Sequence, residues 1–325
     1  MKRTIVCITG PTAVGKTEYA LRIAELLDGE IISADSMQLY RYMDIGSAKP
    51  TAAERARVKH YLVDEIDPRE PFSAALYQKR AKEAIRTVFS KGKLPVVAGG
   101  TGLYVNSLIY DMDFSGSSGS EELRNKFCKI AETAGKEAVH RLLAEKDPAA
   151  AGRIHPNNLK KVIRALEVAE LQGCDGTQGG IPDFSRSFVP TVDYRCILIG
   201  LKRDRAELYA RIDRRVDLLL AQGLLDEVKG LISMGLTEEN ISMKGIGYKE
   251  LIGYLAGEYD FQEAVRLIKR NTRHYAKRQM TWFRRYDRMA WFDLSAAEPE
   301  TVLREMTDHI RQELSPAQES ENGWN

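Results

Sequence analysis

Short apolar runs alternate with helical patterns in the first hundred residues of the chain. Runs at 4–9, 30–34 and 94–100 are rich in β-branched residues and have the length of buried strands. Apolar residues recur at spacings of three and four over 16–28 and near 74–90, which predicts amphipathic helices. This order predicts a parallel sheet with helical crossovers, in which ligands lie at the carboxyl ends of the strands.

The pattern changes at SGSSGS (115–120). Residues 120–172 are helical in pattern throughout, with breaks at Gly135, at Asp147-Pro148 and at His155-Pro156, and the glycine-rich stretch GCDGTQGGIPDFS follows. A strand-like run returns at 195–201, and helices are expected to dominate from there to the end.

These patterns predict an α/β fold with a small all-helical insertion. We expect a core formed by 1–114 and 192–314, the latter part carrying C-terminal helices. The insertion is expected at 115–191, and 315–325 is expected to be a flexible acidic tail.

Composition indicates an ordinary globular protein. Apolar residues make up 43% of the 325 residues and charged residues 29%, and no window approaches the roughly 18 apolar residues of a membrane span. The four cysteines lie far apart without a C-x-x-C pair, so neither a disulfide framework nor a zinc site is expected. We expect a cytoplasmic protein that does not contact a membrane.

Charge is unevenly distributed although the net charge is only +2. Residues 261–290 contain nine Lys or Arg and two acids, whereas 291–325 contain eight acids and two arginines. In the basic segment, cations recur at spacings of 4, 3, 4, 7 and 4 and are expected on one helix face: Arg266, Arg270, Arg273, Lys277, Arg284 and Arg288. Such a stripe either binds phosphate backbones or is a solvated helix face.

The segment GPTAVGKT, from Gly10 to Thr17, has the spacing G-x-x-x-x-G-K-[ST] between a predicted strand and a predicted helix. Glycines there let backbone N–H groups turn toward an anion, Lys16 adds a charge, and Thr17 can offer its hydroxyl to Mg²⁺. A chance glycine-rich turn is the alternative. The flanking elements favour a phosphate loop, and hence a P-loop NTPase-like sheet flanked by helices.

A carboxylate is expected beside this loop. The strand LPVVA ends in GGTG and carries no acid, but Asp35 and Ser36 directly follow the second strand. Asp35 should therefore project at the carboxyl edge of the sheet; the alternative is an aspartate that caps a helix or turn.

Five ordered segments, GPTAVGKT, DSMQLYRYMDIGSAKP, VVAGGTGLY, GIGYKE and KRQMTWF, give the chain a specific resemblance. From about Ile5 to Trp291 it resembles the bacterial tRNA dimethylallyltransferases, also called tRNA isopentenyltransferases. The resemblance implies transfer of a dimethylallyl group from dimethylallyl diphosphate to N6 of the adenosine immediately 3′ of the anticodon. The partners would be Mg²⁺, dimethylallyl diphosphate and the tRNA anticodon stem-loop, with the enzyme acting as a monomer.

By this resemblance, Asp35 would be the general base and Thr101 would hydrogen-bond near the target amine. The donor diphosphate would be bound by Gly10, Thr12, Ala13, Val14, Gly15, Lys16, Thr17 and Arg215. Thr17 would also hold the metal. Without the resemblance, Arg215 has the pattern of a solvated helix charge.

The resemblance also implies three groups of tRNA contacts. Beside the phosphate loop they are Asp35, Ser36, Met37, Gln38 and Thr101. In the insertion they are Arg124, Lys160, Lys161, Val162, Ile163 and Arg164. In the C-terminal helices they are Lys244, Tyr248, Arg273, Lys277, Arg278, Gln279 and Trp282. His274 and Tyr275 are interleaved with the cations, and Trp282 is equally compatible with the core.

At one point the chain departs from many members of the family that it resembles, since Lys160-Lys161 stands where Gln-Arg is frequent. A phosphate contact would survive this change, but a bidentate base contact would not. Two other functions fit a phosphate loop on such a sheet: a small-molecule or nucleotide kinase, and a nucleotide-gated RNA-binding module without chemistry.

Overall fold

The structure is a computed structural model that describes residues 3–112, 114, 120–172 and 189–315 of the chain. The chain divides into two compact units. One comprises Met1–Ile109 and Thr191–Asn325, and the other comprises Tyr110–Pro190. The glycine-rich segment 173–185 and residues 316–325 of the acidic tail, both named in the sequence analysis, lie outside the described residues.

The larger unit is built on a six-stranded parallel sheet with the order β3-β2-β4-β1-β5-β6. The central strands match the prediction to within one residue at each end: β1 (Thr4–Thr9), β2 (Gly29–Ser33), β4 (Leu94–Gly99) and β5 (Arg195–Lys202). Val6 of β1 lies opposite Val96 on one side and Ile197 on the other. The edge strands β3 (His60–Tyr61) and β6 (Ala290–Asp293) were not predicted. Helices dominate after β5 as expected, but β6 lies between α12 and α13.

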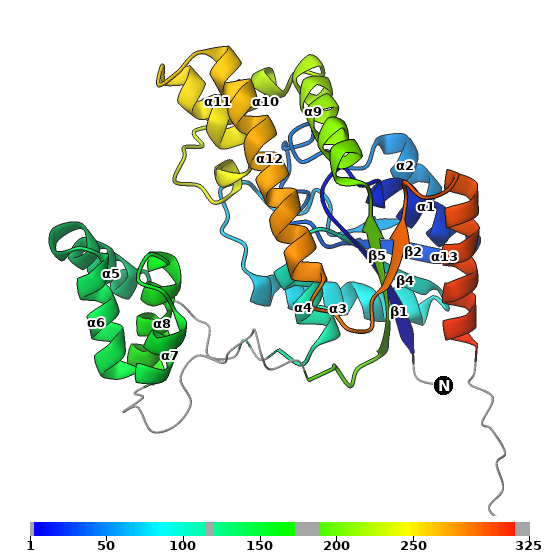
Figure 1. The fold of residues 1–325 in the computed structure, drawn as a ribbon, viewed down its shortest axis with the longest axis horizontal. Coiled ribbons are helices and arrows are strands. Elements are labelled where there is room, and N and C mark those ends of the chain that lie inside the picture. Colours follow the sequence, from blue (N-terminus) through cyan, green and yellow to red (C-terminus); the bar gives the residue numbers. More distant parts are fainter. Residues whose placement is uncertain (1–2, 113, 115–119, 173–188, 316–325) are drawn as a thin grey trace, which may run out of the picture. The chain divides into compact units, whose positions relative to one another are not determined.

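Helices cover both faces of this sheet (Figure 1). The connection from β1 to β2 runs in one direction along the sheet and that from β3 to β4 in the other, so right-handed crossovers put their helices on opposite faces. One face carries α1 (Lys16–Leu26), with α13 (Pro299–Leu314) beside it. The other carries α3 (Ala74–Ser90) and α4 (Gly102–Ile109).

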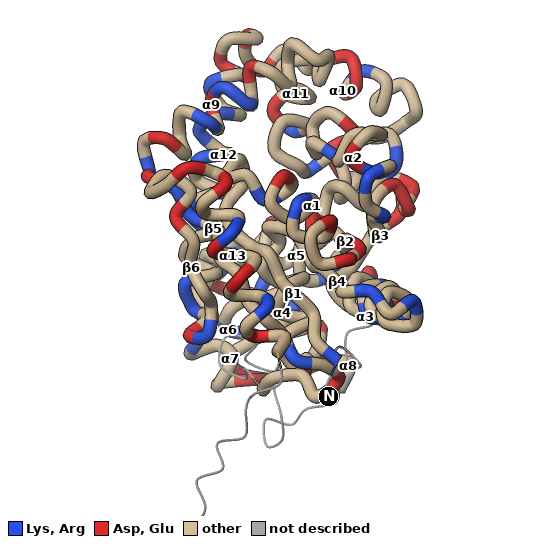
Figure 2. Tube along the Cα trace, turned by 90° about the vertical axis from the view of Figure 1, so that its right-hand side faces the viewer, with Lys and Arg blue, Asp and Glu red and all other residues tan. Residues whose placement is uncertain are grey.

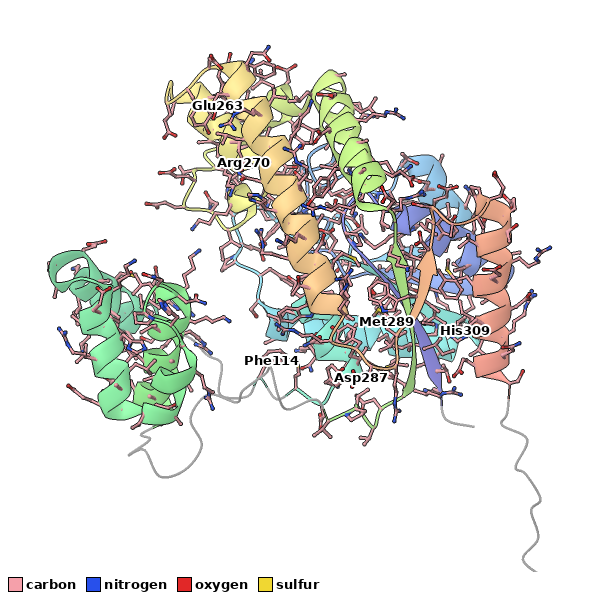
Figure 3. All side chains as sticks on the ribbon, in the orientation of Figure 1. Phe114, Glu263, Arg270, Asp287, Met289 and His309 are labelled. Atoms are coloured by element: carbon pink, nitrogen blue, oxygen red, sulfur yellow. The ribbon has the colours of Figure 1, made fainter. Side chains whose placement is uncertain are left out.

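The remaining helices of this unit follow β2 and β5. A single short helix, α2 (Ala52–Arg57), precedes β3. After β5 come α9 (Arg205–Ala221), α10 (Leu224–Ser233), the 3₁₀ turn η1 (Ser242–Lys244), α11 (Tyr248–Leu255) and α12 (Phe261–Phe283). Helix α12 packs against α9, α11 and α4. Beyond α12 the chain returns to the sheet through Met289, which is labelled in Figure 3. The Thr9 hydroxyl donates to the Met289 sulfur at 3.7 Å.

The predicted basic face is shorter than expected. Helix α12 ends at Phe283 with Arg284 as its C-cap, so Arg284 and Arg288 do not extend the stripe. Within the helix, Arg266 pairs with Glu263, whose position near the start of α12 is labelled in Figure 3. The face therefore consists of the cations from Arg266 to Lys277.

The smaller unit consists of α5 (Glu121–Ala134), α6 (Lys136–Lys146), α7 (Pro148–Arg153) and α8 (Leu159–Gln172). Its breaks lie where the sequence predicted them: Gly135 has φ +82°, and Asp147 caps α7, with Pro148 in the first turn. Phe127, Val139 and Leu166 lie in its apolar core. Across the described residues, both units considered, each helix is too short or too polar to traverse a lipid bilayer.

Candidate active site

Three loops meet at the carboxyl edge of the sheet, after β1, β2 and β4. The crossovers from β1 and β4 leave on opposite faces, which opens a crevice between these strands. The Thr101 N–H donates to the Ala34 carbonyl at 3.1 Å, joining the ends of β4 and β2. A Cβ on Gly99 would overlap the Ala34 carbonyl, so only glycine allows this approach.

The loop after β1 has the backbone of an anion-binding turn. Gly10, Ala13 and Gly15 have positive φ values of 149°, 62° and 118°, and α1 begins at Lys16. Its first-turn N–H groups therefore face the loop without helical partners. Lys16 Nζ donates to the carbonyls of Gly10 and Pro11 at 3.0 and 2.8 Å, which holds the ammonium over the loop.

Two arginines of the segment after β5 hold the backbone of this loop. Arg211 Nε donates to the Ala13 carbonyl at 3.0 Å, and Arg203 Nε donates to the Val14 carbonyl at 2.9 Å. These two carbonyls are therefore satisfied by side chains of the protein. Neither arginine was predicted, since contacts from a side chain to a distant backbone leave no local sequence pattern.

A pocket of about 820 Å³ lies above this edge, within the larger unit. Its polar end is lined by Thr12, Lys16, Thr17, Asp35, Ser36 and Arg215. Its apolar wall comes from α9, α10, α12 and the segment before α11, and includes Ile212, Val216, Leu224, Ile246 and Ile268. Basic positions on α9, which supplies Arg211, Arg214 and Arg215, are visible in blue in Figure 2.

The polar end holds two cations near one carboxylate. Burial lowers the pKa of Lys16 to about 8, the Asp35 carboxylate opposes this shift, and Arg215 adds to it. Burial likewise lowers the pKa of Arg215, again opposed by Asp35. Because burial penalises the charged forms of both side chains, a diphosphate bound beside them would favour those charged forms.

Asp35, Ser36 and Thr101 are brought together as predicted. The Thr101 hydroxyl accepts from the Ser36 N–H at 3.1 Å. Asp35 Oδ1 accepts from the Met37 N–H at 2.9 Å, so this carboxylate does form a local turn while it also lines the pocket. Gln38 lines the pocket too, and its Oε1 accepts from the Ser33 hydroxyl at 2.9 Å.

Helix α12 presents a different face to the pocket than the basic stripe. The residues lining the pocket are Ile268, Thr272, Tyr275, Arg278 and Gln279, which recur at helical spacing. Tyr275 was not among the predicted site residues. Burial and the nearby Asp35 raise its pKa to about 12, opposed by a hydrogen bond with Thr101. The i, i+3, i+4 spacing of Tyr275, Arg278 and Gln279 could have indicated this face of the helix. The prediction instead followed the cations, which are more numerous.

Several predicted tRNA contacts of the larger unit lie outside the pocket lining. Tyr248 is fully buried and donates to Glu227, so its side chain does not reach RNA. Trp282 packs against Gly102 and donates to Asn106 Oδ1 at 3.3 Å. Arg273 pairs with Asp213 of α9 and Lys277 is exposed, whereas Lys244 lines the pocket.

The predicted contacts of the smaller unit fall into two groups. Val162 and Ile163 are buried in its core, at 0% and 7% exposure, so their side chains are not RNA contacts. Lys160 and Lys161 are exposed. Arg124 and Arg164 both pair with Glu167, at 3.0 and 2.6 Å, while keeping 53% and 32% of their side chains exposed.

Comparisons with known proteins agree with this geometry. A family model described as IPP transferase matches residues 38–286. The tRNA dimethylallyltransferase of Alkaliphilus oremlandii is 51% identical over 315 residues, covering 95% of this chain and 99% of the relative. That of Clostridioides difficile is 51% identical over 297 residues, covering 91% of this chain and 94% of the relative.

Solved structures are similar over nearly the whole chain. A full-length tRNA isopentenylpyrophosphate transferase from Bacillus halodurans has 41% identity and a TM-score of 0.71, with 96% of each chain covered. A eukaryotic dimethylallyltransferase, crystallised acting on tRNA, has 25% identity and a TM-score of 0.81, with 98% of this chain and 81% of the other covered. The chain belongs to the tRNA dimethylallyltransferase family, whose members carry this parallel sheet with its phosphate loop.

Proposed function

We propose that this chain transfers a dimethylallyl group from dimethylallyl diphosphate to N6 of the adenosine immediately 3′ of the anticodon in tRNA. The observation that carries the proposal is that one pocket is lined both by the cationic phosphate loop and by Asp35 and Ser36, and that the Thr101 hydroxyl accepts from the Ser36 N–H. A donor anion and an acceptor amine bound at these two places would meet within a single cavity.

The phosphate loop would bind and activate the donor. The negative charge on the leaving diphosphate grows as the allylic C–O bond lengthens, and the loop amides, Lys16 and Arg215 would stabilise that charge. Thr17 lines the pocket in the first turn of α1, where its hydroxyl would hold Mg²⁺ together with diphosphate oxygens. When bound, Mg²⁺ would supply further neutralisation of that charge.

Asp35 would serve the acceptor. The lone pair of the adenine amino group is delocalised into the ring, so N6 attacks the allylic carbon only if its proton is accepted as the bond forms. The N–C bond would form, the C–O electron pair would leave with the diphosphate, and the proton would pass to the Asp35 carboxylate. Thr101, hydrogen-bonded to the Ser36 backbone, would hold the adenine amine in position to attack the allylic carbon.

The target base must leave its stack to enter this pocket. Met37, Lys244 and Arg278 line the pocket and would contact the flipped base or its neighbours. In the smaller unit, exposed Lys160 and Lys161 and the arginines paired with Glu167 would contact backbone phosphates. In this proposal the enzyme acts as a monomer.

Incubation of the protein with labelled dimethylallyl diphosphate, Mg²⁺ and unmodified tRNA tests the proposal. Label should appear in tRNA and, after digestion, in a nucleoside whose mass shows one added dimethylallyl group. A parallel reaction with labelled ATP and candidate small molecules tests the kinase alternative. Phosphorylation without any prenyl transfer would contradict the proposal, and binding of tRNA without transfer would favour the RNA-binding alternative.

A further inference from the structure

We propose that Gln279 is a positioning residue for the transfer, because its carboxamide ties the phosphate loop to the end of β4 and so sets the separation of donor and acceptor. The inference rests on the proposed function. It assigns to a side chain of α12 a role in the geometry of two loops that lie more than 80 residues apart in the sequence.

The side chain bridges the two loops by two hydrogen bonds. Gln279 Oε1 accepts from the Thr12 N–H at 2.8 Å, and Nε2 donates to the Gly100 carbonyl at 2.9 Å. The two partners are backbone groups of fixed polarity, so only this orientation of the carboxamide satisfies both. The residue is 6% exposed, and a buried polar group held at both ends has little freedom to move.

Gly100 shows independently that the two loops are built around this side chain. Its φ lies outside the left-handed region, so its backbone would accept any L-residue. A Cβ there, however, would overlap Nε2 of Gln279. The glycine is therefore required by the space that the carboxamide occupies and not by the local turn.

The two bonded groups adjoin opposite halves of the site. Thr12 belongs to the phosphate loop that holds Lys16, and Gly100 immediately precedes Thr101. Tyr275, one turn earlier on α12, lines the same pocket as Gln279. Through Gln279 the helix contacts both the donor side and the acceptor side.

This arrangement predicts an effect on turnover and not on binding. Gln279 was predicted to contact tRNA, but both ends of its buried carboxamide are bonded within the protein, so that prediction is not supported. Without the bridge, Lys16 still bonds the phosphate loop, and the other residues proposed to contact tRNA are unchanged. What changes is the distance between the allylic carbon and the amine, and a misplacement of about 1 Å costs on the order of 100-fold in rate. A side chain that only packs in the core would instead lower stability and leave the turnover of the folded protein unchanged.

The test compares Gln279→Met with the wild-type protein in the labelled-donor assay. Methionine keeps the length and apolar volume and removes both hydrogen bonds. We expect kcat to fall by about 10- to 100-fold while the KM values for dimethylallyl diphosphate and tRNA change by less than about threefold. Thr281→Val on the same helix is the matched control, since the exposed Thr281 hydroxyl bonds only the Lys277 carbonyl, and its kcat should equal that of the wild type.

A second pair of variants tests the bridge from the other loop. Gly100→Ala should displace the Gln279 carboxamide and reproduce the fall in kcat, although no residue of α12 is substituted. Gln279→Ala is measured as the matching single variant. In Gln279→Ala/Gly100→Ala, the loss should not exceed that of the more impaired of the two single variants, because both changes break the same contact. Thermal unfolding of each variant identifies any that fails to fold, and the remaining ones then decide.

The inference is overturned if folded Gln279→Met keeps kcat within about threefold of the wild type, or if its loss of kcat/KM comes wholly from a higher KM for the donor. It is also overturned if the losses of kcat in Gln279→Ala and Gly100→Ala multiply in the double variant. Failure of the proposed function has a different outcome, because the wild-type protein would then transfer no label at all.

Discussion

The hydroxyl of Tyr248 donates to the carboxylate of Glu227 at 2.7 Å, and Glu227 links this tyrosine to a loop near the start of the chain. The same carboxylate accepts from the backbone N–H groups of Asp44 and Ile45, both at 2.7 Å, and of Gly46 at 3.0 Å. A Cβ on Gly46 would overlap the Tyr248 ring. The segments DIGS and GIGYKE are thus tied together beside the pocket, with one buried tyrosine and one carboxylate between them.

Glu227→Gln should destabilise the protein. Both carboxylate oxygens accept hydrogen bonds, whereas the amide nitrogen of glutamine cannot accept, so at least two donors would lose their partner. We expect the free energy of unfolding to fall by about 1–3 kcal/mol, measured by chemical denaturation. Asp226→Asn, at the neighbouring exposed position, should change it by less than about 0.5 kcal/mol. Equal stabilities of the two variants would show that the carboxylate does not hold the loop.

The contacts of Glu227 with Tyr248 and with the backbone of 44–46, called the Glu227 clamp below, could not be predicted from the sequence, whereas the phosphate loop could. The loop is encoded within Gly10–Thr17 by local spacing, and its strand and helix flank it directly, so both were predicted. Asp35 could be placed because it directly follows a recognisable strand. The Glu227 clamp depends on two segments meeting in three dimensions, and no local pattern marks it; Tyr248 was for that reason taken for an RNA contact.

The edge strand β6 was missed and the basic stripe was predicted too long because of the same part of the chain, the turn that follows α12. The four residues Ala290–Asp293 are only half-buried, so they lack the continuous apolar run of a central strand. Counting cations through Arg288 extended the helix past Phe283, where the chain turns back to the sheet. Val162 and Ile163 were predicted to contact tRNA because of their positions in a motif. They are buried because their side chains lie on the face of α8 that meets the core.

Donor affinity should depend on the protonation of Lys16. Its pKa of about 8 in the ligand-free pocket lies below the usual 10.5 because burial penalises the ammonium. Above pH 8 the free protein loses this proton, and the uncharged amine attracts a diphosphate less. The Kd of dimethylallyl diphosphate, measured by calorimetry without tRNA, should therefore rise by up to about tenfold per pH unit between pH 8 and 9.5.

Lys16→Met is the control for this pH dependence. It should bind the donor more weakly throughout, and the slope above pH 8 should be absent because the titrating group is gone. A wild-type Kd that stays constant from pH 7 to 9.5 would show that Lys16 remains charged in the free protein.

Asp35→Asn should separate chemistry from binding. Asparagine keeps the Oδ1 that accepts from the Met37 N–H, so the turn is preserved, but it cannot accept the proton of the adenine amine. We expect single-turnover transfer to slow by about 10²- to 10⁴-fold with the Kd of the donor within about threefold of the wild type. Transfer at the wild-type rate would exclude Asp35 as the base, and a matching loss of donor binding would assign it to the donor side.

The exposed part of the basic face of α12 should contribute to tRNA binding through charge alone. Lys277 is exposed, whereas Arg266 and Arg273 of the same face form ion pairs with Glu263 and Asp213. If Lys277 contacts a phosphate, Lys277→Met should weaken tRNA binding and reduce the slope of log K against log salt concentration by about 1. Lys229→Met, which removes an exposed lysine from α10, should leave that slope unchanged. Identical slopes for all three proteins would assign Lys277 to a solvated helix face, since an ion that contacts no phosphate releases no counterion.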